Sequence, residues 1–161
     1  MMAATPPPPS SPPLVQMLRH LTGRPKAGLR YLTPEQAKRM NVPNALVDPR
    51  MKNGKIVGAS NRMFMPQGTY QALESLTKDT GVTWPEETQA LALMTFLHEA
   101  GHMRSGKNWQ NERRQQAFAL GHYLSSAKRL GVDPEKAARM YDAVVKYTQS
   151  LPSDYRPRRK P

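Results

Sequence analysis

Two histidines and a glutamate in the middle of the chain have the types and spacing of a metal-dependent hydrolytic site. They are His98, Glu99 and His102, in the pattern H-E-x-x-H. On an α-helix, residues four apart lie one turn above each other, about 40° around the axis, so both imidazoles can bind one metal ion. Glu99 stands beside the first histidine and can take a proton from a water on that metal. The motif therefore predicts Zn²⁺ on His98 and His102, with Glu99 as general base.

The residues ahead of the motif predict that it lies on a buried helix. Residues 90–97 are apolar nearly all round, as expected of a central helix. Unpaired polar groups in such a place cost roughly 2–7 kcal/mol, so the two histidines and the glutamate need something to satisfy them. A zinc ion would do so. The alternative is that His98 and His102 are ordinary helix histidines.

A catalytic zinc site takes a third protein ligand, for which the sequence offers two main candidates. Glu112 lies ten residues past His102, at the start of the next predicted helix. A break at residues 105–108 would let that helix fold back beside the first. His122 lies about 15 Å further along the same helix, so it and Glu112 cannot both bind one ion directly. Glu112 fits more easily; His122 and an acidic residue elsewhere remain alternatives.

The motif and the residues after it resemble those of a known family. His98-Glu-Ala-Gly-His102, followed by Asn111-Glu112-Arg-Arg-Gln-Gln-Ala117-Phe118-Ala119, is similar to the compact gluzincins, particularly ImmA/IrrE-type metallopeptidases. Residues 58–66 also resemble the strand before the active-site helix of small zincins, and the resemblance covers residues 54–125. It implies that Glu112 is the third ligand. It also implies a minimal zincin core, with a small antiparallel sheet packed on the motif helix.

The fold class predicted from these patterns is α+β, mostly helical, with the small antiparallel sheet on the H-E-x-x-H helix. We expect helices over residues 14–21, 33–40, 69–77, 85–104, 109–130 and from 133 to about 150. Residues 55–60 and 61–66 read as strands, forming either a hairpin or one bent strand. In this division, residues 1–30 are a proline-rich disordered leader and basic connector, 31–151 the zincin-like domain, and 152–161 a basic disordered tail.

Substrate contacts are predicted less directly. An edge strand could bind an extended peptide by backbone pairing, and we assign this role to Arg62, Met63, Phe64 and Met65. A side chain that stabilises the developing oxyanion is also expected. His122 and Tyr123 are candidates, and both could instead be structural.

Composition limits the remaining choices. The net charge is +12 and the pI near 10.3, but the charge reads as dispersed, with its densest cluster at residues 156–160. Because aromatic residues are few and not interleaved with basic ones, nucleic acid is not expected as the main partner. The chain has no cysteine, so a metal must be held by histidine and carboxylate. The sequence shows no signal peptide and no membrane span, and we expect a cytoplasmic protein.

The function predicted from these features is zinc-dependent hydrolysis of a peptide bond in a protein or peptide substrate. Two alternatives remain open. One is a basic zincin-fold module that binds protein or nucleic acid without cleaving it. The other is an accessory component of a larger assembly, such as a phage particle.

Overall fold

The computed structural model describes residues 12–41, 45–105 and 110–152 of the chain. The predicted disorder of residues 1–11 and 153–161 lies outside these ranges. Six helices and three strands are present in the described part: α1 (Pro12–Thr22), β1 (Gly28–Leu32), α2 (Pro34–Arg39), β2 (Leu46–Lys52), β3 (Lys55–Pro66), α3 (Gln67–Glu74), α4 (Glu86–Arg104), α5 (Glu112–Arg129) and α6 (Pro134–Gln149). The predicted α+β class is confirmed.

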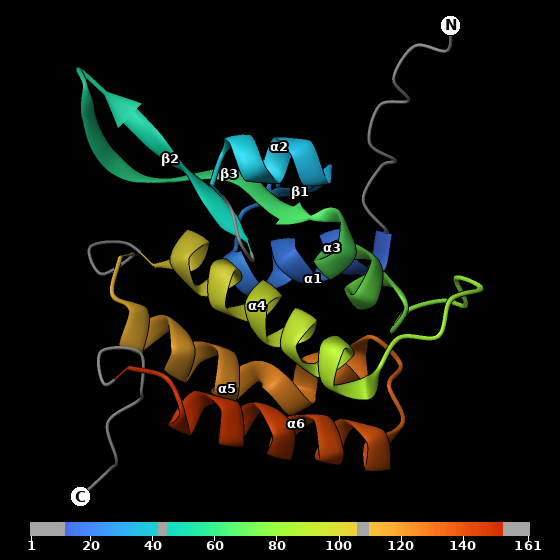
Figure 1. The fold of residues 1–161 in the computed structure, drawn as a ribbon. Coiled ribbons are helices and arrows are strands. Elements are labelled where there is room, and N and C mark those ends of the chain that lie inside the picture. Colours follow the sequence, from blue (N-terminus) through green and yellow to red (C-terminus); the bar gives the residue numbers. More distant parts are fainter. Residues whose placement is uncertain (1–11, 42–44, 106–109, 153–161) are drawn as a thin grey trace, which may run out of the picture.

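Helix α4 is the centre of the fold. It packs against α1, α3, α5 and α6 and against strands β2 and β3 (Figure 1). Twelve of its nineteen residues are buried, among them His98 and His102, because the helix has neighbours on nearly every side. The buried central helix predicted from the apolar run is confirmed. The structure therefore places the H-E-x-x-H residues in the interior of the molecule.

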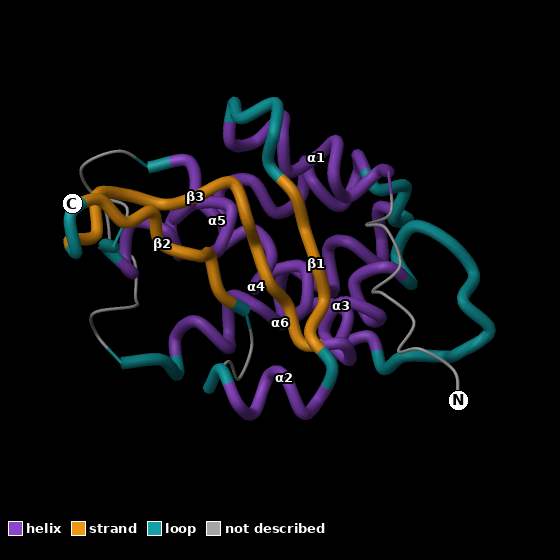
Figure 2. The backbone as a smooth tube through the Cα atoms, turned by 90° about the horizontal axis from the view of Figure 1, so that it is seen from above, coloured by secondary structure: helices purple, strands orange, loops and turns teal. Residues whose placement is uncertain are grey.

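The sheet lies over α4 (Figures 1 and 2), and its strand order is β1-β3-β2. Strands β2 and β3 are antiparallel, but β1 pairs with β3 in parallel, so the sheet is mixed. The prediction of a purely antiparallel sheet is wrong because it did not include β1. Strand β1 follows α1 after a short connection and lies beside β3.

Strand β3 runs without interruption from Lys55 to Pro66, which selects the single bent strand over the hairpin. Two register shifts in its pairing with β2 and the φ of 152° at Gly58 mark the irregular part. The hairpin instead joins β2 to β3. Its turn residues, Asn53 and Gly54, have φ of 52° and 75°, the left-handed conformation that the sequence Asn-Gly favours.

The folded domain begins earlier than predicted. The helix expected over residues 14–21 is present, but its Leu14, Met17 and Leu18 belong to the main hydrophobic core. Strand β1 belongs to the sheet. The predicted boundary at residue 31 is therefore wrong. Short apolar segments next to a proline-rich stretch looked like a connector, whereas tertiary packing makes them part of the domain.

Local sequence signals account for several helix ends. Thr33 and Gln36 form a capping box at α2, and the Asp133 side chain accepts from the first backbone N–H groups of α6. Asn111 caps α5 in the same way. Among the described residues, no helix combines the length and apolar character needed to cross a membrane.

Candidate metal centre

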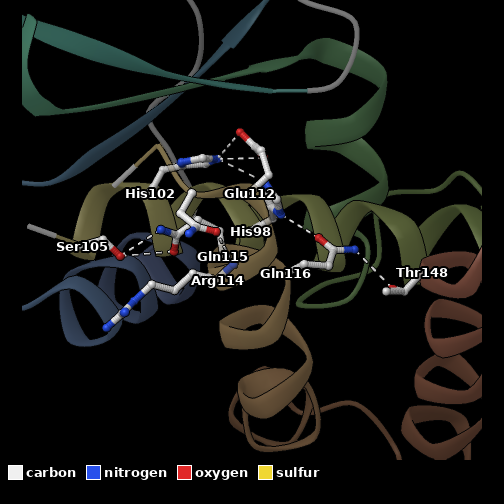
Figure 3. A network of polar contacts seen from close by, with 9 residues as sticks. His98, His102, Ser105, Glu112, Arg114, Gln115, Gln116 and Thr148 are labelled. Carbon is white, nitrogen blue, oxygen red and sulfur yellow. Dashed lines mark hydrogen bonds and ion pairs between the residues drawn. The ribbon is translucent and has the colours of Figure 1, made fainter. Parts of the chain in front are cut away.

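Three side chains meet between α4 and the first turn of α5. His98 Nε2 lies 2.6 Å from Glu112 Oε2 and 3.1 Å from His102 Nε2. His102 Nε2 lies 3.2 and 3.3 Å from the two oxygens of Glu112 (Figure 3). The structure thus brings together the two histidines and the acidic residue that the sequence favoured as third ligand, with their potential donor atoms all within 4.8 Å of one another.

The chemistry and spacing of these atoms suit a divalent transition metal. In a tetrahedral zinc site with Zn–N and Zn–O bonds of ~2.0–2.2 Å, ligand atoms lie about 3.3 Å apart. The nitrogen–nitrogen distance and the His102–Glu112 distances are close to this value. Only the His98–Glu112 contact is shorter, as expected of atoms joined by a hydrogen bond. Two nitrogens and a carboxylate oxygen are a common donor set for zinc.

A chain of hydrogen bonds fixes the protonation of His98. The Thr148 hydroxyl donates to the Val144 carbonyl over 2.8 Å, so it accepts from Gln116 Nε2 at 3.2 Å. The amide oxygen of Gln116 therefore faces His98 Nδ1, 2.6 Å away. Since that oxygen only accepts, His98 carries a proton on Nδ1 and turns Nε2 toward His102 and Glu112. The ring thus presents to the site the nitrogen that would bind a metal ion, in place of the proton of its 2.6 Å hydrogen bond to Glu112.

A close approach of α4 and α5 makes this arrangement possible. A Cβ at Gly101, within the motif, would lie 2.5 Å from Gln115 Oε1 and 3.0 Å from Phe118 Cδ1. Gln115 Nε2 also donates to Ser105 Oγ at 2.9 Å, which ties the start of α5 to the end of α4 (Figure 3). Glycine at position 101 allows α5 to lie near enough for Glu112 to reach both histidines.

Glu112 occupies the first position of α5, directly after its cap Asn111. A carboxylate is favourable there because the helix N-terminus carries a partial positive charge. Burial alone would raise the pKa of Glu112, but hydrogen bonds to His102 and His98 outweigh it and lower the pKa to about 2. Glu112 is therefore ionised at neutral pH, as a metal ligand must be.

Glu99 is placed beside this group rather than within it. Its carboxylate is partly buried, accepts a hydrogen bond from the backbone N–H of Val47 on β2, and interacts with the charges of His102, His98 and Glu112. Burial raises the pKa of Glu99, although the histidine charges and the Val47 N–H oppose that effect. A carboxylate with a raised pKa, next to a metal site but free to accept a proton, has the properties of a general base.

The predicted substrate strand is contradicted by the structure. Residues 62–65 lie in the central strand β3, where Met63 pairs with Leu29 of β1 on one side and Val47 of β2 on the other. Met63 and Met65 are also fully buried. Their backbone groups are used within the sheet, so they cannot receive a peptide. In the described part of the chain, β1 and β2 are the edge strands, and β2 is the one that contacts Glu99.

The alternative candidates lie elsewhere. His122 is exposed, its ring packs on Phe118 with centroids 4.4 Å apart, and it lines a surface hollow with His20. It does not join the His98–His102–Glu112 group. Tyr123 is buried and donates its hydroxyl to the Ala90 carbonyl at 2.8 Å. That bond indicates a structural role, and burial raises its pKa.

Comparisons with known proteins do not assign the chain to a family. No protein-family model matches it, and neither the curated proteins nor the solved structures contain a significant match.

Gln116 and Thr148 were not among the residues predicted for the site. Gln116 lies four residues after Glu112, hence on the same face of the helix, and this spacing could have identified it. Thr148 lies on the apolar face of the last helix, where the pattern is typical of core packing. Its role depends on α6 packing against α4 and α5, which no local pattern shows.

Proposed function

We propose that this protein is a zinc-dependent peptidase. The observation that supports the proposal is a group of three potential metal ligands with a separate carboxylate, suited to act as a base, beside them. Three donors from His98, His102 and Glu112 converge, and a second carboxylate, Glu99, lies beside them with a raised pKa. A purely structural histidine site would have no need for such a neighbour. The cytoplasmic location expected from the sequence remains a prediction.

Each side chain has a distinct task in this proposal. His98, His102 and Glu112 would hold the ion, which would lower the pKa of a bound water to about 7 and polarise the scissile carbonyl. Glu99 would accept a proton from the attacking water and pass it to the leaving amine as the carbon–nitrogen bond breaks. Gln116 and Thr148 keep His98 in the required tautomer and orientation.

The edge of β2 is the better candidate for binding the peptide backbone. It is an edge strand of the described sheet, and its Val47 contacts Glu99, so a substrate paired along it would lie over the candidate centre. Main-chain hydrogen bonds of this kind hold an extended peptide with little dependence on its side chains. This assignment replaces residues 62–65.

The test compares zinc-loaded wild type with Glu99→Gln on a peptide library derived from a whole proteome. New peptide termini are identified by mass spectrometry, and zinc content is measured on the same samples. Glutamine keeps the shape of the side chain but cannot take a proton. We expect cleavage to fall by about 10²–10⁴-fold, which is the usual contribution of a general base, with the zinc content unchanged.

Two controls complete this experiment. Addition of a zinc chelator should stop cleavage by the wild type. Glu87→Gln removes an acidic side chain of the same helix outside the site, and it should leave cleavage unchanged. Equal cleavage by wild type and Glu99→Gln at equal zinc content would contradict the proposed mechanism.

A further inference from the structure

The positive charge of the chain is concentrated in the sheet region. Residues 24–62 contain nine lysines and arginines and two acidic residues, a net charge of +7. Residues 67–151, which include helices α3 to α6 and are called the helical body below, contain ten basic and nine acidic residues, a net charge of +1. The dispersed charge inferred from the sequence is therefore wrong. The strands and the segment before them carry most of the excess within the described part of the chain.

Some of these cations surround a hollow at the base of the β2–β3 hairpin. The hollow has a volume of about 480 Å³ and is lined by Gly23, Arg24, Pro25, Lys26, Arg50, Ala59, Ser60 and Asn61. Three of these residues are basic, and none is acidic. The lining thus combines space for a ligand with uncompensated positive charge.

Neutral atoms hold Arg24 at this position. Its Nη1 donates to the Ala59 carbonyl at 2.9 Å and to Asn61 Oδ1 at 3.2 Å. These bonds fix the guanidinium without neutralising it. Partial burial and the nearby charge of Arg50 lower the pKa of Arg24, so two like charges are held close together. Such an arrangement costs free energy unless an anion is present.

The row of cations continues along the hairpin arm, residues 50–58. Lys52 is paired directly with Lys55 across the two strands, and side chains of a cross-strand pair point to the same face. Arg50 lies two residues before Lys52 on the same strand and also lines the hollow, so it connects the two groups. All three are exposed, and the arm extends beyond the helical body (Figures 1 and 2). Like charges directly opposite each other are destabilising.

We propose that this basic surface, formed by Arg24, Lys26, Arg50, Lys52 and Lys55, binds the phosphodiester backbone of a nucleic acid. A small anion bound in the hollow would leave the positive charge of the arm uncompensated. A chain of phosphates can follow both, because arm residues two apart are about 6.6 Å apart and repeat along the strand. Lysines on exposed strands also discourage sheet aggregation, but this does not explain why Arg24 and Arg50 are held close together.

The surface is continuous with the candidate metal centre. Strand β2 begins at the centre, where Val47 contacts Glu99, and ends at Lys52 in the arm. At about 3.3 Å per residue, these two positions are roughly 17 Å apart. A bound nucleic acid would therefore lie beside the candidate site. The inference does not depend on the peptidase activity, because it rests on charge and geometry outside the centre.

The experiment measures binding of the full chain to a fluorescein-labelled DNA duplex, and to single-stranded RNA of the same length, over a range of salt concentrations. The test variant is Arg50→Ala/Lys52→Ala/Lys55→Ala, whose side chains are exposed. The charge control is Lys128→Ala/Lys146→Ala in the helical body. A tail control replaces Arg156, Arg158 and Arg159 by alanine. Circular dichroism checks that each variant retains its fold.

We expect the wild type to bind at least one of the two nucleic acids with an affinity that falls steeply as salt rises. The arm variant should bind at least about tenfold more weakly at low salt, with a salt slope smaller by roughly 2–3, since each phosphate contact contributes about 0.9. The charge control should change affinity by less than about threefold.

Three results would overturn the inference. The first is an arm variant that binds like the wild type while the tail control loses binding, since the tail would then be the binding element. The second is equal loss in the arm variant and the charge control, which would indicate net charge alone. The third is absence of salt-dependent binding to both nucleic acids.

Discussion

The helical body and the sheet region differ in how their charged side chains are arranged. Between α4 and α5 the ionisable side chains are few, buried or half-buried, and close to one another, and the body as a whole is nearly neutral. In the sheet region the charges are nearly all positive, and those at the base and tip of the arm lack acidic partners among the described residues. The first arrangement suits a reaction centre, and the second suits attraction of a polyanion. Variants that affect one region should leave the other unaffected.

The largest effect is expected from removing a ligand in the helical body. His102→Ala deletes one of three donors and should lower zinc affinity by more than about 100-fold, because two ligands do not make a stable site. Binding of the DNA duplex should change by less than about twofold. Zinc affinity is measured by competition with a chromogenic chelator and DNA affinity by fluorescence anisotropy. Loss of both properties at once, in a folded variant, would show that the regions are not independent.

Gln116→Ala should have the next largest effect. It removes the amide oxygen that faces His98 Nδ1, so the ring is held less firmly in its orientation and tautomer, and zinc affinity should fall by about 10–100-fold. Gln116→Glu keeps an acceptor facing His98 and should restore most of that affinity. A merely structural role for Gln116 would make the two variants equally weak, which the same chelator competition would reveal.

Thr148→Val tests the far end of the hydrogen-bond chain. Valine has nearly the same shape but cannot accept from Gln116, so the amide is no longer fixed, and we expect a smaller loss of zinc affinity, about 3–10-fold. Thr22→Val is the matched control. Thr22 is also buried and donates to the carbonyl four residues earlier, but it lies in α1, away from the centre. It should lower the melting temperature without changing zinc affinity.

Gly101→Ala tests the close helix approach. Alanine gains about 1 kcal/mol of helix propensity, but its Cβ must displace Gln115 and Phe118, and overpacking of this kind costs about 1–3 kcal/mol. We expect a small net destabilisation, together with weaker zinc binding because α5 moves away. Gly121→Ala, on an open face of α5, should be neutral or stabilising. Urea unfolding of both variants measures the difference.

The smallest effect concerns pH. In metal-free protein the lowered pKa of Glu112 contributes stability that is present above about pH 4.5 and is lost as pH falls toward about 2. The melting temperature of wild type minus that of Glu112→Gln should therefore be largest near neutral pH and shrink with acid. A difference that grows toward low pH would contradict the ionised Glu112 of this account.

The sequence was most informative where the structure is local. The spacing of His98 and His102 predicted that both lie on one side of a helix, and they do. The capping box at Thr33 and the Asn53–Gly54 turn likewise depend on residues close together in the chain. The position of Glu112 was also predicted, because a short break between two helices leaves few ways for α5 to fold back.

The sequence was least informative where distant segments meet. Residues 62–65 were assigned to an edge because β1 was not recognised, and a strand between two others cannot be distinguished from an edge strand by its own alternation. Gln116 and Thr148 meet only through packing of α5 and α6. Arg24 and Arg50 are far apart in sequence, and only the fold brings them together at one hollow.

The central claim is that His98, His102 and Glu112 hold one metal ion. The most direct measurement is the zinc stoichiometry of purified wild type and Glu112→Ala by elemental analysis, with circular dichroism to verify the fold of both. This account predicts one zinc per chain in the wild type and a large loss in the variant. A wild type that takes up no zinc even after reconstitution, or a variant that binds zinc as fully as the wild type, would contradict it.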